Sequence, residues 1–132
     1  MILFLKHKWF DLIASGEKKE EYREYKPYWD RRIWRIATMP PNERTIEFRR
    51  GYTKTAVWVR YLGSVRRCID DDGMYCCMDL NAVTPEYMAT LHPDVVKSCN
   101  LVAIECRADW GYEPDKHSVI IRLGEIVKCQ AN

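Results

Sequence analysis

The hydrophobic residues near the start of the chain predict a strand followed by a helix. Residues 1–6 form a short apolar run, which is typical of a buried strand. Within 8–15, Phe10 and Ile13 lie at helical spacing and would share one side of a helix. Gly16 follows directly, and glycine readily adopts the left-handed conformation that often ends a helix. We therefore expect a short helix that ends at Gly16.

Later patterns predict a second helix and a series of strands. Pro27 stands where the first turn of a helix would begin. Thr84 and Pro85 predict the start of a further short helix, to about Leu91. Runs of β-branched and aromatic residues predict strands at 45–48, 56–65, 101–106 and 118–127, with a tight turn at 70–73. This pattern predicts an α+β domain, a small mixed β-barrel of about six strands with two or three short helices.

The composition indicates one domain over residues 1–132. The hydrophobic fraction of 47% is ordinary, and the length suffices to bury a core without a metal or a disulfide. No apolar segment approaches the length that spans a bilayer, so we expect a cytoplasmic protein with no membrane partner. The six cysteines form no C-x-x-C pair and the three histidines are scattered. We expect no metal site and no cofactor, and we interpret the cysteines as reduced, partly buried thiols.

Charge is spread unevenly along the chain. Residues 1–67 contain sixteen Lys and Arg against eight Asp and Glu, whereas residues 68–132 contain five against eleven. The two halves carry +8 and −6, which gives the net charge of +2. This asymmetry is consistent with a basic face that meets polyanions. It is equally consistent with two halves that mix in space and dilute the asymmetry.

The stretch 16–24 combines dense alternating charge with the aromatic residues that follow it. Such a charge run is often only a solvated face. Here it follows a helix with an apolar side, and it leads into aromatic residues interleaved with Lys and Arg. Aromatic rings stack on bases and cationic side chains contact phosphates. The stretch is therefore a candidate nucleic-acid or nucleotide cleft, although Trp29 and Trp34 are also candidates for core packing.

A resemblance to a known family is carried by this same stretch. Gly16-x-Lys18-x-x-Glu21-x-Arg23 resembles the Gly-x-Lys-x-x-Glu-x-Arg signature of the ASCH domain family, whose members are relatives of PUA domains. The opening strand and helix, the segment 22–29 found in phage and prophage members, and the closing residues 110–126 are also similar. Residues 66–102 have no counterpart and look like an insertion. The resemblance implies a PUA-like β-barrel.

The resemblance implies binding of RNA or nucleotides in a cleft beside the signature. One branch of the family hydrolyses N4-acetylcytidine with a Lys, a Thr and a Glu, and another member is described as a ribonuclease. By position the Lys falls on Lys18, and Glu21 replaces the Thr, so the hydroxyl nucleophile is missing here. Glu105 is the best candidate for the third residue. A neutral Lys18 could act as a base, whereas an ion pair with Glu21 would keep Lys18 protonated as a contact for phosphate or carbonyl oxygen.

The leading interpretation is a binding module for RNA, a nucleoside or a nucleotide. A hydrolase using the same cleft is the second interpretation, and a protein-interaction domain using the inserted segment is the third. Phosphate contacts are expected from Lys18, Lys19, Arg23, Arg50 and Lys54, and base stacking from Tyr52, Trp29 or Trp110. Residues 50–54 could equally be an ordinary hairpin turn, and Trp110 could instead cap the barrel.

The signature requires a bend if its residues are to meet. In a regular strand, Lys18 would face one side of the sheet, and Glu21 and Arg23 would face the other. Lys18 and Glu21 can share a cleft only if the chain bends or bulges between them. We therefore expect an irregular segment near Lys18 and Lys19.

Overall fold

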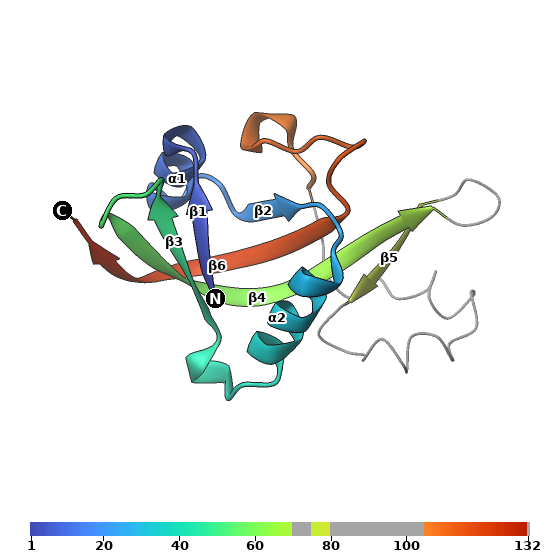
Figure 1. Ribbon diagram of the computed structural model, residues 1–132, viewed down its shortest axis with the longest axis horizontal. Helices are drawn as coiled ribbons and strands as arrows, with labels where there is room; N and C mark the ends of the chain where they lie inside the picture. The colour runs from blue at the N-terminus through green and yellow to red at the C-terminus, as the bar shows by residue number, and fades with distance from the viewer. Residues whose placement is uncertain (70–74, 80–104, 132) are drawn as a thin grey trace.

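The computed structural model describes residues 1–69, 75–79 and 105–131. Within this part of the chain, one six-stranded sheet packs beside two α-helices (Figure 1). Five strands follow the order β1-β3-β4-β6-β2, and β5 pairs with the far end of β4. The strands are β1 (Ile2–Leu5), β2 (Glu20–Arg23), β3 (Thr45–Arg50), β4 (Ala56–Ile69), β5 (Tyr75–Asp79) and β6 (Val119–Gln130).

Strands β4 and β6 form the long spine of the sheet. They pair antiparallel, and their register shifts between Trp58 and Gly63. Gly63 has a φ of 150°, and irregularities of this kind bend a strand and increase its twist. Figure 1 shows the two strands curving together across the molecule. Because β1 is parallel to β3 and the other pairs are antiparallel, the sheet is mixed, as the sequence predicts.

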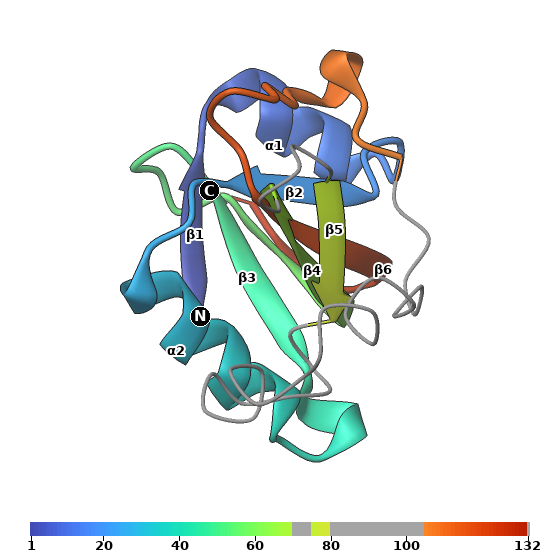
Figure 2. The same cartoon turned by 90° about the vertical axis from the view of Figure 1, so that its right-hand side faces the viewer.

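The α+β class is confirmed, but the expected barrel is wrong, because the sheet does not close. β1 and β2 are the two ends of the strand path, and no ladder in the described residues joins them. Each has only four residues, and the chain between them forms α1 (His7–Ala14) and an irregular segment rather than a hairpin. Figure 2 shows β1 and β2 at a steep angle to one another beside α1. An open seam remains between the two ends of the sheet.

Both described α-helices begin or end where the sequence predicts. After α1, Gly16 has a φ of 82°, and the Leu12 carbonyl accepts a hydrogen bond of 2.9 Å from the Lys18 N–H. This bond closes the helix end and directs the chain toward β2. The second helix, α2 (Pro27–Ala37), starts at the predicted proline. No helix among the described residues is both long and apolar enough to cross a membrane.

Several predicted elements fall outside the described residues. They are the turn at 70–73, the helix at 84–91 and most of the strand at 101–106. Glu105 and Cys106, at the end of that predicted strand, are described and are not in a strand. The proposed insertion is described only where β4 continues to Ile69 and pairs with β5.

Two clusters of buried side chains lie around the sheet. The larger one joins the sheet to α1 and α2, and it includes Phe10, Ile33 and Phe48. The smaller one joins β2, β4 and β6 to the segment 105–117 that precedes β6. Its buried members are Tyr22, Val65, Trp110, Tyr112 and Ile120. This smaller cluster holds the segment 105–117 over the end of the sheet where the seam lies.

The packing of β6 can be tested with two matched substitutions. Val119 has no exposed surface, whereas Val127 on the same strand is 50% exposed. Val119→Ala should lower the free energy of unfolding by about 2 to 3 kcal/mol, because it removes two buried methyl groups and leaves a cavity. Val127→Ala should cost less than about 1 kcal/mol. Both variants remove the same two methyl groups from one strand. Equal losses in the free energy of unfolding, measured with urea, would therefore contradict the burial of Val119 in the core.

Candidate functional site

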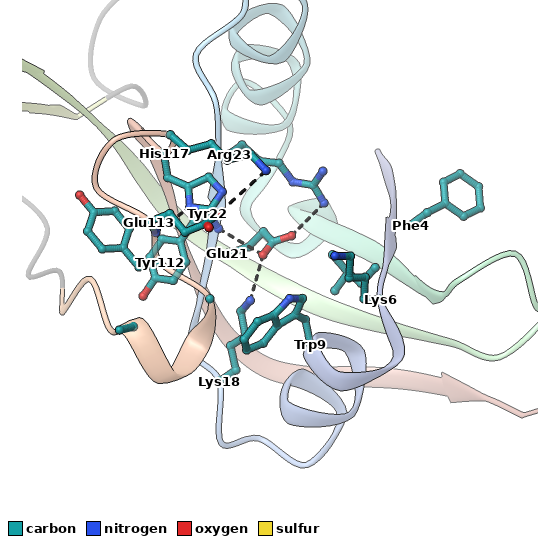
Figure 3. Close-up of a pocket in the computed structure, with 14 residues that line it drawn as sticks. Phe4, Lys6, Trp9, Lys18, Glu21, Tyr22, Arg23, Tyr112, Glu113 and His117 are labelled. Carbon is teal, nitrogen blue, oxygen red and sulfur yellow. Dashed lines mark hydrogen bonds and ion pairs between the residues drawn. The ribbon is translucent and has the colours of Figure 1, made fainter.

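A cavity of about 450 Å³ occupies the seam between β1 and β2 (Figure 3). Residues 4–6 line it from one edge of the sheet and residues 21–23 from the other. Trp9 of α1, Lys18 and the segment 108–117 complete the lining. Cavities that hold small ligands have volumes of about 300 to 1,000 Å³. The open seam therefore provides a cavity large enough for a small ligand.

A buried chain of ion pairs lies in this cavity. The Lys18 ammonium is 3.1 Å from Glu21 Oε1, and an Arg23 guanidinium nitrogen is 2.8 Å from Glu21 Oε2. Lys18 and Glu21 are 3% and 4% exposed, and the side chain of Arg23 is 23% exposed. The Tyr22 backbone N–H also donates to Glu21 Oε1, at 3.1 Å. One carboxylate thus holds two cations in place, and the group carries one positive charge in excess.

The local chain path explains why these residues meet. The strand begins only at Glu20, and residues 17–19 have no regular secondary structure. The expected irregular segment is therefore confirmed. Glu21 and Arg23 share one face of β2 because successive strand residues alternate, and the bend brings Lys18 to that same face.

Aromatic rings form a second part of the cavity. The Lys18 ammonium lies 4.9 Å from the centre of the Trp9 ring and 5.6 Å from that of Tyr22. The Tyr22 ring is 5.0 Å from the Tyr112 ring and stacks on His117 at 6.1 Å. Figure 3 shows Tyr112 and His117 on one side of the ion pairs and Phe4 and Lys6 on the other. The cavity thus combines flat apolar surfaces with cationic groups.

The segment that carries Tyr112 and His117 is anchored by a buried carboxylate. Glu20 is 1% exposed, and its carboxylate accepts hydrogen bonds from the Glu105 N–H (2.9 Å), the Cys106 N–H (3.0 Å) and the Tyr22 hydroxyl (2.7 Å). The Tyr22 oxygen in turn accepts from the Arg107 N–H at 3.0 Å. Burial and the bond to Glu20 raise the pKa of the Tyr22 hydroxyl well above its usual range, so it remains a donor.

The backbone around Cys106 is shaped for this anchor. Cys106 has a φ of 52°, the only positive φ of a non-glycine residue in the described residues. A left-handed residue can direct successive backbone N–H groups toward one anion. The conformation of Cys106 is therefore consistent with the two backbone hydrogen bonds that Glu20 accepts here.

His117 has a defined protonation pattern. Its Nδ1 accepts a hydrogen bond of 3.0 Å from the Glu113 N–H, so the proton of the neutral ring lies on Nε2. Burial lowers the pKa of His117, and the Glu113 carboxylate partly opposes that effect. The ring therefore lines the cavity as a neutral group near pH 7.

The lining as a whole is cationic. It contains Lys6, Lys18, Arg23 and Lys116 against two carboxylates, those of Glu21 and Glu113. An anionic ligand would therefore be attracted to it. No group of three or more His, Cys, Asp or Glu that could hold a metal ion occurs among the described residues.

The structure gathers some of the predicted site residues and separates others. Lys18, Glu21 and Arg23 meet in the cavity, whereas Lys19 is exposed and does not line it. The Glu105 carboxylate does not reach Lys18. The Glu105 side chain is 59% exposed, and one carboxylate oxygen lies 3.7 Å from an Arg107 guanidinium nitrogen. Only the backbone N–H of Glu105 contributes to the site, by donating to Glu20. The sequence pattern could place Glu105 nearby but could not show which of its atoms points inward.

The predicted residues of the turn 50–54 lie on the far side of β1. The Arg50 guanidinium is held by the Asp11 carboxylate at 2.9 and 3.2 Å. Tyr52 is 95% exposed and its ring lies 5.3 Å from that of Phe4. Lys54 lines a separate cavity of about 90 Å³ together with Trp58. Tyr52 contacts the cavity residue Phe4 through its ring, and Arg50 pairs with the cavity residue Leu5 in the ladder between β1 and β3.

The two predicted stacking tryptophans have packing roles instead. Trp29 is partly buried against the larger cluster, and its ring lies 5.4 Å from the Arg23 guanidinium. Trp110 is 3% exposed inside the smaller cluster, so its ring has no open face. Trp9, Tyr112 and His117 provide rings to the cavity, and the sequence analysis does not single them out. The one signal for Trp9 is its place in the helix that directly precedes the signature.

Comparisons with known proteins add no relative. No protein-family model, no curated protein and no solved structure matches this chain.

The anchor at Glu20 makes a prediction about stability. Glu20→Gln replaces one acceptor oxygen by an NH₂ group that would face a backbone N–H. We expect a loss of about 1 to 3 kcal/mol in the free energy of unfolding, together with faster hydrogen exchange at residues 105–107. Glu125→Gln is the control, because Glu125 is 71% exposed in a surface ion pair and should cost less than about 1 kcal/mol. Unchanged exchange at residues 105–107 would contradict the anchor.

His117 makes a prediction about pH. Because burial lowers its pKa below the ordinary value of 6.5, the unfolded chain takes up a proton at higher pH than the folded one. The free energy of unfolding should therefore fall as the pH decreases through about 6.5. His117→Asn keeps an acceptor for the Glu113 N–H without titrating, so this part of the slope should disappear. Equal slopes in the two proteins, measured by urea unfolding between neutral and mildly acidic pH, would refute the prediction.

Proposed function

We propose that this chain is an ASCH-type binding domain that holds a nucleotide, free or within single-stranded RNA, in the cavity between β1 and β2. The observation that carries the proposal is the Lys18–Glu21–Arg23 group beside the partly exposed ring of Trp9. Bases stack on aromatic rings, and phosphates pair with guanidinium and ammonium groups. A nucleotide presents both chemistries in one molecule.

The positions of the cations fit the two ends of a nucleotide. Lys18 is buried, so it is suited to an oxygen of a base or sugar that enters the cavity. Arg23 is partly exposed, and Lys6 and Lys116 are more exposed than Arg23. These three cations are suited to a phosphate that stays near solvent.

Binding is better supported than hydrolysis. Lys18 donates a hydrogen bond to Glu21 at 3.1 Å, an arrangement that suits a hydrogen-bond donor to a ligand rather than a base. The described lining contains no Ser, Thr or Cys that could serve as a nucleophile. Glu105 supplies no carboxylate to Lys18. The third interpretation depends on the inserted segment, most of which is outside the described residues.

Two neighbouring lysines provide a matched test. Lys18→Met and Lys19→Met each remove one positive charge, but only Lys18 lines the cavity. Nonspecific attraction to a polyanion depends on charge and should change equally in both variants. Loss of a charged hydrogen bond should make Lys18→Met bind about 10- to 100-fold more weakly. Fluorescence anisotropy with a labelled single-stranded RNA of mixed sequence, and calorimetry with ribonucleoside monophosphates, measure the effect.

Two outcomes would refute the proposal. Equal weakening by the two variants would show that only overall charge attracts RNA. Turnover of N4-acetylcytidine that is lost in Lys18→Met would show an enzyme instead. Glu21 keeps its bonds from Arg23 and the Tyr22 N–H in this variant, and a thermal unfolding curve checks that the fold survives.

A further inference from the structure

An exposed pair of aromatic rings continues the cavity across the outer face of β1. Phe4 lines the cavity, is 47% exposed, and lies 5.3 Å from the ring of Tyr52, with 31° between the ring planes. Tyr52 is 95% exposed, so almost all of its ring meets solvent. We call these two residues the outer platform. Isolated exposed rings are ordinary, but this platform shares Phe4 with the cavity.

The turn that carries Tyr52 is held in place by the rest of the fold. The Gly51 N–H donates to the Leu5 carbonyl at 2.8 Å, which ties the turn to the end of β1. Gly51 has a φ of 59°, and a Cβ there would lie 3.3 Å from a ring nitrogen of His7. The ion pair of Arg50 with Asp11 ties the same turn to α1. The turn therefore presents the Tyr52 ring at a defined place, while the ring itself buries almost nothing.

Cationic groups lie next to the platform. Lys6 lines the cavity directly after β1, and no ion pair of Lys6 is found within the described part of the chain. Figure 3 shows Lys6 between Phe4 and Trp9. The Arg49 guanidinium, which is paired with the Glu47 carboxylate, lies 5.9 Å from the centre of the Phe4 ring. An ammonium at this position, between two aromatic surfaces, matches a nucleic acid strand, in which one phosphate joins the sugars of two neighbouring nucleosides.

We propose that the ligand is a single-stranded nucleic acid of at least two nucleotides. One base enters the cavity, and its neighbour stacks on Tyr52, with Lys6 near the phosphate between them. This inference rests on the proposed function and narrows it, because a free mononucleotide would leave the outer platform unused. A protein partner fits less well, because β1 adds only one more exposed apolar side chain, that of Ile2, to the two rings, and Lys6 lies beside them.

Three substitutions at Tyr52 separate stacking from simple apolar cover. Tyr52→Phe keeps an aromatic ring, Tyr52→Leu keeps apolar surface without a ring, and Tyr52→Ala removes both. Calorimetry would compare ribonucleoside monophosphates with dinucleoside monophosphates, each with its deoxyribose counterpart to tell RNA from DNA. Because Tyr52 is 95% exposed, all three variants should unfold at nearly the same temperature as the unaltered protein.

We expect the unaltered protein to bind dinucleoside monophosphates about tenfold more tightly than mononucleotides, from one additional stacked base. Tyr52→Ala and Tyr52→Leu should abolish that difference and leave mononucleotide binding unchanged, and Tyr52→Phe should preserve it. If mononucleotides bind but the second nucleotide adds nothing, or if Tyr52→Leu behaves like the unaltered protein, the outer platform is refuted and the cavity stands. If neither ligand binds, both proposals fall.

Discussion

The cavity depends on the hydrogen bonds that the Glu20 carboxylate accepts. They join β2 to a segment 85 residues further along the chain, and that segment carries Tyr112 and His117. The Tyr22 hydroxyl extends the connection by donating to Glu20 and accepting from the backbone of Arg107. Burying a carboxylate costs free energy unless hydrogen-bond donors surround it. Glu20 therefore stabilises the fold only when this segment is in place. The anchor and the cavity wall therefore form together.

Two adjacent glutamates in β2 have different roles, because successive side chains of a strand point to opposite faces of the sheet. Glu20 faces the smaller buried cluster and binds backbone N–H groups, whereas Glu21 faces the cavity and binds Lys18 and Arg23. The strand is only four residues long, yet it contributes to both the structure and the candidate site. The open seam then supplies the space, because β1 approaches the cavity from its other side without pairing with β2 in the described residues.

The sequence predicted local features well and long-range contacts poorly. The helix end at Gly16, the helix start at Pro27 and the irregular segment before β2 follow from the preferences of a few neighbouring residues. The meeting of Lys18 with Glu21 and Arg23 was expected from the resemblance to the signature, and it requires the irregular segment before β2. The open seam of the sheet could not be predicted, because it depends on where the short strands β1 and β2 end.

The roles of individual distant side chains were equally hard to predict. Glu105 was expected to supply a carboxylate and supplies a backbone N–H, and Trp110 is buried while Trp9 lines the cavity. A tryptophan in a helix and one in a loop look alike in sequence, and tertiary packing alone decides which ring is covered.

The anchor at Glu20 has one more consequence. Its carboxylate accepts from the backbone N–H groups of Glu105 and Cys106, while the side chain of Glu105 remains more than half exposed. Replacing the Glu105 side chain would change the charge at that surface and leave the bond from its backbone N–H to Glu20 in place. The position of this segment and the charge beside it are thus set by different atoms.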